Sequence, residues 1–476
     1  MKNITYLLSI IMVLLTTACT KDFQEINTNP NAPTTVQPSL LLRQVIYNYG
    51  EEMSYEGFVA GNLLSQHFTM IDFNLFDRHD LTAPQVGGNP WPVLYTNLRD
   101  NEILLNQARS NPSAAVYEGP ALILKAYFAA ALTDIYGDVP YFEALSGQDG
   151  NVTPEYDSQE DIYLSENGIL DNLRKAVEVI KSYNGAQTLE GDILYNGNLA
   201  DWINLANSLR IKYLLRVSDR IDIRNEMEEI FQTVEYILTN NQNATFDFAD
   251  GQPNNFRMAT LRDGDFNLFI MSETSEEILK ELDDPRMERF FRPAANSGEF
   301  KGLLNGPDAS ATSISVADFS RAGTMFRENT GVLDANFMTA WETHFLLAEA
   351  AQKGFINEDA ETLYNEGVRL AFEYWQTDLP PNYLGTAAAY QNGDPIEQII
   401  TQKWIANTIN GYDSWIEYRR TGFPKLKTIS ASLNDNLIPV RMPYPTDEAA
   451  LNSSNYNAAT AENDNSVNAR VWWDVD

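Results

Sequence analysis

Residues 337–375, FMTAWETHFLLAEAAQKGFINEDAETLYNEGVRLAFEYW, decide the fold class of this chain. In both halves of the stretch, apolar residues recur at spacings of three and four, which is the pattern of one buried helix face. They are Trp341, Phe345 and Ala348 in the first half and Tyr364, Val368, Ala371 and Trp375 in the second. Gly354 interrupts the pattern between them. The stretch therefore predicts two helices, Phe337 to Gln352 and Ala360 to Trp375, that pack against each other as a hairpin.

The same spacing occurs in three other stretches, Ala121 to Tyr136, Asn198 to Arg216 and Glu226 to Leu238. Gly137 is placed to end the first helix, and Asn198 is placed to cap the second. Helix, short break and helix, with small residues opposite large ones, is typical of tetratricopeptide-type hairpins, although no clean repeat of roughly 34 residues is present. We therefore expect a mostly α fold built on a scaffold of tetratricopeptide-like helix pairs.

Long irregular segments separate the predicted helices, and strand-like sequence is limited to short pieces such as Ala244 to Phe248. These segments are rich in Gly, Asn, Asp and Pro and are longer than the usual connections of compact helical domains. They run from Ser65 to Pro92, Asp138 to Tyr156, Phe246 to Arg327 and Ile429 to Asp476. Because long loops on a rigid scaffold usually carry function, we expect the binding residues in these loops.

Two of the long loops combine aromatic rings with fork-shaped donors and carboxylates. The candidate ligand-binding residues are Phe73, Phe76 and Trp91 in the first loop and Phe256, Arg262, Asp263 and Phe266 in the third. This mixture suits a carbohydrate, because the apolar faces of sugar rings stack on aromatic planes while hydroxyl groups bond to Arg and Asp side chains. The alternative is that each aromatic ring only pins its own loop to the helices.

The only cysteine of the chain, Cys19, follows the apolar run Ile4 to Leu15 and three small residues. This run, preceded by the cation Lys2, is too short to cross a hydrocarbon layer of about 30 Å and is typical of a secretion signal. A lone cysteine cannot form an internal disulfide. Residues 15–19, LTTAC, look like a bacterial lipobox, with Thr16 where leucine is usual.

A lipobox at this position divides the chain into three parts. We expect a lipoprotein signal peptide in residues 1–18, a lipidated tether in residues 19–38 and a single α-helical domain in residues 39–476. The tether is rich in Asn, Pro and Thr, which is linker composition rather than core composition. The alternative is an ordinary secreted protein with a free cysteine.

Charge and hydropathy argue against three classes of protein. The chain has 33 basic and 66 acidic residues, for a formal net charge of −33, so it should repel the phosphates of nucleic acids. A hydrophobic content of 44%, with 11% aromatic residues, supports a packed core rather than a disordered chain. Because no later stretch looks long and apolar enough to span a membrane, the acyl chains on Cys19 are the expected sole membrane attachment of a soluble body.

The sequence lacks the common catalytic and metal-binding motifs. The three histidines, His67, His79 and His344, show no metal-ligand spacing, and His344 is expected to be an ordinary helix residue. No GxSxG, Walker or GxGxxG motif is present. A pair of carboxylates for glycoside hydrolysis stays open, because the sequence does not give the separation of two acids.

One acidic loop resembles the start of a calcium site. Asp263, Asp265 and Asn267 have the right spacing, but Leu268 stands where glycine belongs and Thr274 where the bidentate glutamate belongs. An EF-hand is therefore rejected. We expect no cofactor and leave open only a weak loop-bound calcium.

Several separate motifs occur in a fixed order along the chain. They are Asp134 to Tyr141; Trp202 to Arg216, which contains Ala206 to Arg210; Glu342 with Phe345 to Ala350; Gln402 to Trp404 with Trp415 to Pro424; and Ile438 to Pro445 with Glu448, Asn455, Tyr456, Trp472 and Trp473. On these motifs the chain resembles the starch-utilisation-system D (SusD)/RagB family of nutrient-binding outer-membrane lipoproteins of Bacteroidetes, in its second major branch. The resemblance covers nearly the whole length.

The resemblance implies a fold of four tetratricopeptide-like helix pairs and an irregular ligand-binding portion, docked as a lid on a SusC-like TonB-dependent transporter. It implies that the protein binds an oligosaccharide without cleaving it, anchored in the outer membrane and facing the cell exterior. Asp138 and Tyr141 would fix a turn, and Arg419 and Arg420 would pair with scaffold carboxylates. A peptide ligand, an anchored glycoside hydrolase and a lid that never touches ligand are the alternatives.

Overall fold

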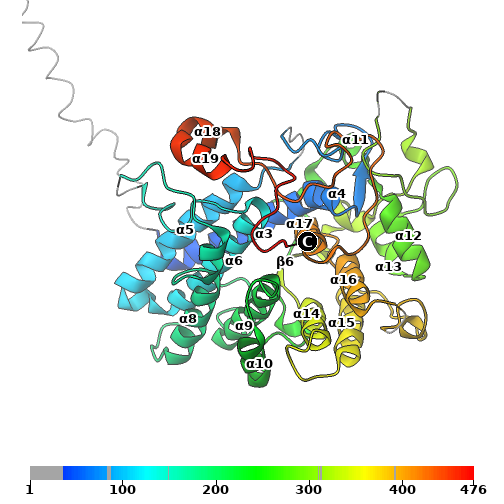
Figure 1. Ribbon diagram of the computed structural model, residues 1–476. Coiled ribbons are helices and arrows are strands. Elements are labelled where there is room, and N and C mark those ends of the chain that lie inside the picture. The colour runs from blue at the N-terminus through cyan, green and yellow to red at the C-terminus, as the bar shows by residue number, and fades with distance from the viewer. Residues whose placement is uncertain are drawn as a thin grey trace, which may run out of the picture.

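A computed structural model describes residues 36–475, except residues 83–86, 148–149, 309, 311–312 and 391–392. Cys19 and the predicted signal peptide lie outside these residues. Helices make up most of the described chain, and the strands are short (Figure 1). The expected mostly α fold on a helix-pair scaffold is confirmed.

The first half of the chain forms a group of long helices, each of which contacts the next. The group consists of α3 (Pro38–Glu56), α5 (Trp91–Ser110), α6 (Glu118–Tyr136), α8 (Ile169–Ser182), α9 (Leu199–Arg216) and α10 (Arg224–Thr233). Gly137, with a φ of 83°, ends α6, and the Asn198 side chain caps α9 by accepting a bond from the Ala200 N–H at 3.1 Å. Helix α10 ends before the predicted Leu238, because Val234 adopts a left-handed conformation with a φ of 54°.

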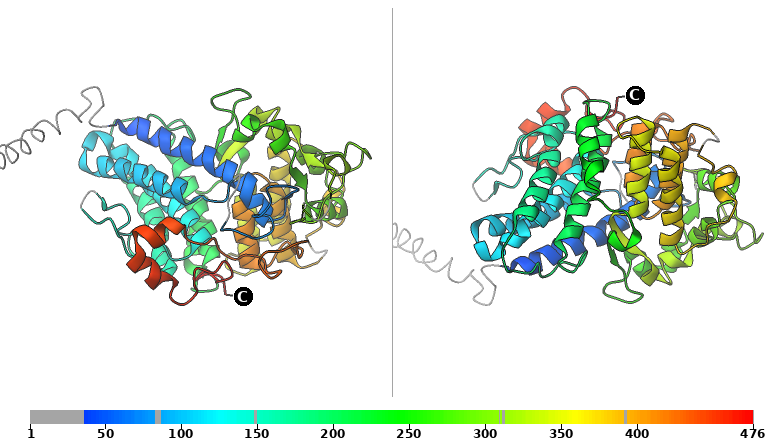
Figure 2. Two further views of the ribbon diagram at one scale, coloured as in Figure 1. Left: turned by 90° about the horizontal axis from the view of Figure 1, so that it is seen from above. Right: turned by 90° about the horizontal axis from the view of Figure 1, so that it is seen from below.

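The second group contains the hairpin that the sequence marks most clearly. It consists of α14 (Ala340–Gln352), α15 (Ala360–Tyr374), α16 (Pro395–Ala406) and α17 (Gly411–Thr421). Helix α14 contacts α15, α16 and also α9, so it joins the two groups, which stand side by side in Figure 2. The predicted helix start at Phe337 is wrong. Phe337 and Met338 end strand β6 (Asp334–Met338), and the Thr339 side chain caps α14.

Shorter helices occupy the loops. They are α4 (Asn62–Leu64), α7 (Gln159–Leu164), α11 (Asp263–Phe266), α12 (Glu273–Glu281), α13 (Arg286–Phe290), α18 (Thr446–Leu451) and α19 (Ser453–Thr460). Helices α18 and α19 lie along the upper edge of the molecule in Figure 1, as does α11. This edge therefore collects parts of the predicted third and fourth loops.

The strands form two small sheets. Strands β1 (Phe68–Met70), β3 (Phe269–Met271), β5 (Arg321–Ala322) and β4 (Phe291–Arg292) make one sheet in this order, in which every paired neighbour is antiparallel. Strand β2 (Ala244–Asp247) pairs with β6 in an antiparallel ribbon. Residues 248–333 leave and re-enter the helical scaffold through this ribbon, so the third long loop is held at its base by backbone hydrogen bonds.

Aromatic packing joins the third loop to the scaffold. Phe58, in the π-helical segment Gly57–Gly61 that continues α3, is fully buried. Its ring centroid lies 4.9 Å from that of Phe68, 5.4 Å from Phe269 and 4.9 Å from Phe326. Such contacts stabilise beyond the burial of area alone, so the sheet and the scaffold share one core.

One helical stretch, Pro112–Tyr136, is long and apolar enough by composition to span a membrane, contrary to the expectation from the sequence. Its most apolar window is 78% buried inside the protein. The stretch comprises a short 3₁₀ segment and α6, which packs on α5 and α8. We interpret it as a core helix of the scaffold.

Candidate functional site

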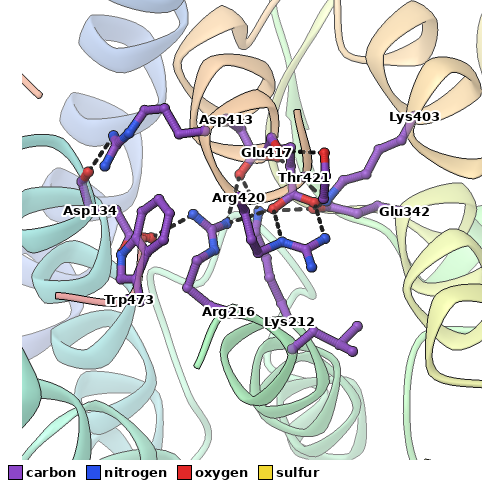
Figure 3. Close-up of polar contacts among 12 residues, drawn as sticks. Asp134, Lys212, Arg216, Glu342, Lys403, Asp413, Glu417, Arg420, Thr421 and Trp473 are labelled. Atoms are coloured by element: carbon purple, nitrogen blue, oxygen red, sulfur yellow. Dashed lines mark hydrogen bonds and ion pairs between the residues drawn. The ribbon is translucent and has the colours of Figure 1, made fainter. Parts of the chain in front are cut away.

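Four of the motif segments meet at a buried network of charges between α6, α9, α14, α16 and α17 (Figure 3). The Lys212 ammonium lies 2.8 Å from a Glu342 oxygen and 2.7 Å from an Asp413 oxygen. The Arg216 guanidinium lies 3.0 Å from the Asp134 carboxylate and 3.0 Å from that of Glu417. The network therefore ties the two helix groups together by ion pairs.

The same network continues into the helical hairpin. Arg420 reaches Glu349 on α14 at 2.5 Å and Glu417 at 2.8 Å, while Lys403 lies 3.3 Å from Glu417. The predicted pairing of Arg420 with scaffold carboxylates is thus confirmed. Arg419 donates to the backbone oxygen of Asp134 at 2.7 Å.

Two carboxylates of this network, Asp413 and Glu417, have lowered pKa values. Burial by itself would raise the pKa of Asp413, but Lys212 and Lys403 outweigh it and hold that pKa below its usual value. Burial is outweighed in the same way at Glu417, whose pKa is lowered by Arg420 and Lys403. A general acid for glycoside hydrolysis requires a raised pKa, so we assign this network to the scaffold.

Most of the predicted ligand-binding aromatics are buried. Phe256 is fully buried, with its ring centroid 5.9 Å from that of Phe58, and Phe266 is 1% exposed beneath the Arg327 guanidinium. Phe76 packs against Gly88, and Trp91, at the start of α5, lies edge-on to Tyr136 with the centroids 4.9 Å apart. The four rings pack beneath their loops, and their contact with ligand stays a prediction.

The other three predicted residues are exposed. Phe73 is 56% exposed, and the side chains of Arg262 and Asp263 are 86% and 81% exposed. The first and third loops lie next to each other here, because the Ile71 N–H donates to the Leu268 oxygen at 3.3 Å. The structure thus brings Phe73 to the same region as α11.

A pocket of about 290 Å³ opens between the first and fourth long loops. It is lined by Leu81, Thr82, Gly88, Asn89, Tyr136, Met442, Pro443, Tyr444, Pro445, Thr446, Asp447, Ala449, Tyr456 and Asn465. We call it the loop pocket. Its wall is fixed in place, because the Gly88 N–H donates to Glu56 at 2.7 Å and the Tyr444 hydroxyl donates to the Asp138 backbone oxygen at 2.6 Å.

Aromatic rings form one wall of the loop pocket. Tyr444 lies 6.3 Å from Tyr456 and 6.1 Å from Trp91, measured between ring centroids. Asn89, Thr446 and Asp447 are exposed at its rim. Aromatic walls with a few polar groups suit a sugar.

The charged side chain in the lining of the loop pocket is acidic. Asp447 is the one charged residue among the described residues that line it. Behind the wall, the buried Arg441 guanidinium lies 4.4 Å from the Tyr444 ring centroid and donates to Asn465 at 3.3 Å. A neutral ligand would meet no uncompensated cation or buried anion here.

Sequence reasoning missed the tyrosines and asparagines of this pocket. Tyr444, Asn465 and Tyr456 belong to the fourth long loop, in which no ligand residue was predicted. Asn89 lies in the first loop, two positions before the predicted Trp91. The available signal was the density of aromatic and amide residues between Tyr444 and Asn465, but the sequence does not show which of them face the first loop.

The acidic loop that begins like a calcium site forms ion pairs. Asp265 accepts two bonds from Arg262, at 2.8 and 3.1 Å, and Asp263 lies 2.8 Å from Arg327. Within the described ranges, no three His, Cys, Asp or Glu side chains are grouped so that they could hold a metal. Among the histidines, His344 bonds to the Ala340 oxygen at 2.9 Å within α14.

Comparison with known proteins identifies the family to which this architecture belongs. Residues 30–445 match the SusD-like family model described as "Starch-binding associating with outer membrane". This chain belongs to the SusD-like family. A comparison with curated protein sequences finds no match.

Solved SusD homologues have the same fold. One from Bacteroides fragilis NCTC 9343 is 27% identical, with a TM-score of 0.78, over 92% of this chain and 99% of that chain. One from Bacteroides uniformis ATCC 8492 is 24% identical, with a TM-score of 0.73, over 92% and 99%. A chitin-binding SusD homologue from Flavobacterium johnsoniae is 23% identical, with a TM-score of 0.77, over 92% and 98%. The last two show the fold alone.

Proposed function

We propose that this SusD-like chain captures an oligosaccharide in the loop pocket and delivers it, without cleaving it, to a SusC-like TonB-dependent transporter. The observation that carries the proposal is the loop pocket itself. It has a tyrosine wall and an exposed Asn and Thr rim, and it is built from two long loops on a rigid helical scaffold. Apolar planes with amide and hydroxyl partners match the alternating faces and hydroxyl groups of sugars.

The family description supports a glycan over a peptide ligand. The family is described as starch-binding, and one solved structure of the same fold is described as chitin-binding. Both polysaccharides are neutral, and the described residues that line the loop pocket include no lysine or arginine to hold an anionic group.

The exposed patch of Phe73, Arg262 and Asp263 is proposed as a second contact for ligand or transporter. It lies on the described surface where the first and third loops meet, and its side chains are the most accessible of those predicted from the sequence. Phe76, Trp91, Phe256 and Phe266 would support these loops from beneath. The role of the patch is separate from the role of the loop pocket. Phe73→Ala tests it, because this variant should weaken binding of oligosaccharide or of the transporter if the patch contacts either.

The location that we propose is the outer membrane, through lipid on Cys19, with the helical domain facing the cell exterior. The division into a signal peptide at 1–18, a tether at 19–38 and one domain at 39–476 belongs to this proposal, and α3 begins at Pro38, close to the predicted boundary. Replacing Cys19 with Ala should release the protein from the membrane fraction of cells. Unchanged membrane attachment of Cys19→Ala would contradict the anchor.

Calorimetric titration of the purified chain with malto-oligosaccharides and chito-oligosaccharides tests the proposed function. We expect Tyr456→Ala and Asn89→Ala to weaken binding by about tenfold or more, equivalent to about 1.4 kcal/mol. Leu451→Ala is the matched control, because Leu451 is 75% exposed on α18 and does not line the pocket.

Three outcomes would contradict the proposal in different ways. Release of reducing sugar by the wild type, abolished by one Asp or Glu substitution, would indicate a hydrolase. Binding of peptides but of no oligosaccharide would indicate the peptide-binding alternative. Binding of neither would indicate a structural lid.

A further inference from the structure

A second and larger groove runs along one face of α5. Its volume is about 580 Å³, and it is lined by helix residues that include Pro92, Tyr95, Arg99 and Ile103, with Leu145 opposite them. We call it the α5 groove. The helix positions recur at spacings of three and four, so they form one stripe. From Pro92 to Asn106, which also lines the groove, the helix rises by about 21 Å at roughly 1.5 Å per residue.

The folding of α5 leaves this stripe uncovered. Its other face carries Leu94, Leu98 and Leu105, which are buried where α5 packs on α3 and α6. On the groove side, Ile103 is 39% exposed and Pro92 is also exposed. Apolar surface is therefore available along the helix, between polar side chains.

The charged groups that line the α5 groove, Arg99 and Glu102, are paired and balanced in charge. The Arg99 guanidinium lies 2.8 Å from Asp100, and its side chain is 62% exposed. Glu102 is held by Lys125, with the ammonium 2.8 Å from the carboxylate. Apolar strips with one balanced cation and anion favour a neutral, hydroxyl-rich ligand over a charged one.

The α5 groove begins where the loop pocket ends. Asn89 lines the loop pocket, Pro92 lines the groove, and Trp91 stands between them. The Trp91 ring centroid lies 4.8 Å from that of Tyr95 in the groove and 6.1 Å from that of Tyr444 in the pocket. Trp91 thus contacts one lining residue of each cavity.

A second loop also joins the two cavities. Residues 138–157 contribute Leu145 to the groove and Tyr156 to the rings beside the pocket, where its centroid lies 5.1 Å from that of Tyr444. The same loop is bonded to α18, because the Tyr156 hydroxyl donates to Glu448 at 2.8 Å. Figures 1 and 2 both show α18 and α19 beside α5 and α6.

We propose that the α5 groove is an extension subsite that binds further sugar units of the same neutral oligosaccharide whose end occupies the loop pocket. This inference rests on the proposed function. It adds a second subsite, in the α5 groove, and the expectation that affinity increases with the length of the oligosaccharide until both cavities are filled.

The test compares ligands of increasing length. Malto-oligosaccharides and chito-oligosaccharides, from disaccharides upward, are titrated into the wild type and into Ile103→Asp by calorimetry. We expect Ile103→Asp to lower the affinity for the longest oligosaccharide that binds by about tenfold, equivalent to about 1.4 kcal/mol. The affinity for the shortest one that binds should be unchanged. Leu451→Asp, the same kind of change at a 75% exposed position outside both cavities, should alter neither.

The outcomes separate the two proposals. Equal affinity for short and long ligands in the wild type would overturn the extension subsite while leaving the loop pocket intact. An equal effect of Ile103→Asp on all lengths, or no effect on any, would also overturn it. The absence of binding by every oligosaccharide would overturn both the subsite and the proposed function.

Discussion

Replacing Arg420 should lower the free energy of unfolding, because it breaks the buried charge network from one side. The Arg420 guanidinium bonds to both oxygens of Glu349, at 2.5 and 2.6 Å, and Glu349 is fully buried. In Arg420→Met, Glu417 keeps Arg216 and Lys403 as partners, but Glu349 keeps only Lys353 at 3.0 Å, whose side chain is 28% exposed. The variant therefore leaves one buried carboxylate largely uncompensated.

The expected loss is about 3 to 5 kcal/mol in the free energy of unfolding, which is the range for breaking a buried ion pair from one side. The double variant Arg420→Met/Glu349→Leu removes the orphaned charge. It should recover at least about half of the loss, because replacing both partners with apolar groups of similar size is close to neutral.

The pH dependence gives an independent check on the same reasoning. Burial alone would raise the pKa of Glu349, but Arg420 outweighs it and lowers that pKa in the wild type. A carboxyl with a lowered pKa contributes stability that is present above its unfolded pKa and is lost as the pH falls through the folded value. Without Arg420, burial dominates and Glu349 takes up a proton more readily. The difference between wild type and Arg420→Met should therefore shrink as the pH falls.

Urea unfolding, followed by circular dichroism at neutral and mildly acidic pH, measures these differences. A loss below about 1 kcal/mol for Arg420→Met at neutral pH would refute the reasoning, because it would be no larger than the worth of a surface pair. A double variant less stable than the single variant would refute it as well.

Three further predictions concern other parts of the molecule. Gly61→Ala should destabilise the protein, because the added methyl carbon would lie 2.2 Å from the backbone nitrogen of Tyr412; a melting temperature equal to that of the wild type would contradict this close approach. Burial and the cross-strand neighbour Asp247 raise the pKa of Asp334 to about 7, so this carboxyl contributes stability that is fully present below its unfolded pKa and is lost as the pH rises through about 7. Asp247→Asn should reduce this loss of stability as the pH rises toward about 7, measured in a pH series of unfolding curves. Because Asp447 is the charged residue in the lining of the loop pocket, a sulfated oligosaccharide should bind more weakly than its neutral counterpart at low salt, and Asp447→Asn should narrow the difference.

The helices of the scaffold were predictable because each carries its own signal. Residues 121–136 and 198–216 show a periodic apolar face, a stop at Gly137 and a cap at Asn198, and the observed helices keep these ends. The start of α14 was predicted too early because Phe337 fits both a helix face and a strand. Phe337 lies in a strand because β6 pairs with β2, which is distant in the sequence.

The proposed ligand site lies in the long loops, as the sequence predicts, but its lining residues differ from those that the sequence predicts. An aromatic ring in a loop can either face solvent or fill the space beneath the loop, and the sequence does not distinguish these cases. Phe256 and Phe266 fill the core, whereas Phe73 faces solvent. The wall of the loop pocket depends on Tyr444 and Tyr456 meeting a loop more than three hundred residues earlier in the chain, which only long-range packing brings about.

By itself, the sequence determined the helical scaffold, the excess of acidic residues and the SusD-like membership, because periodicity, composition and motif order are local or additive properties of the chain. Tertiary structure alone decided which loop segments enclose a cavity, that the buried charges compensate one another, and that α5 leaves one face uncovered beside the loop pocket. These features depend on distances between residues that are remote in the sequence, and such distances are set only when the two helix groups pack together.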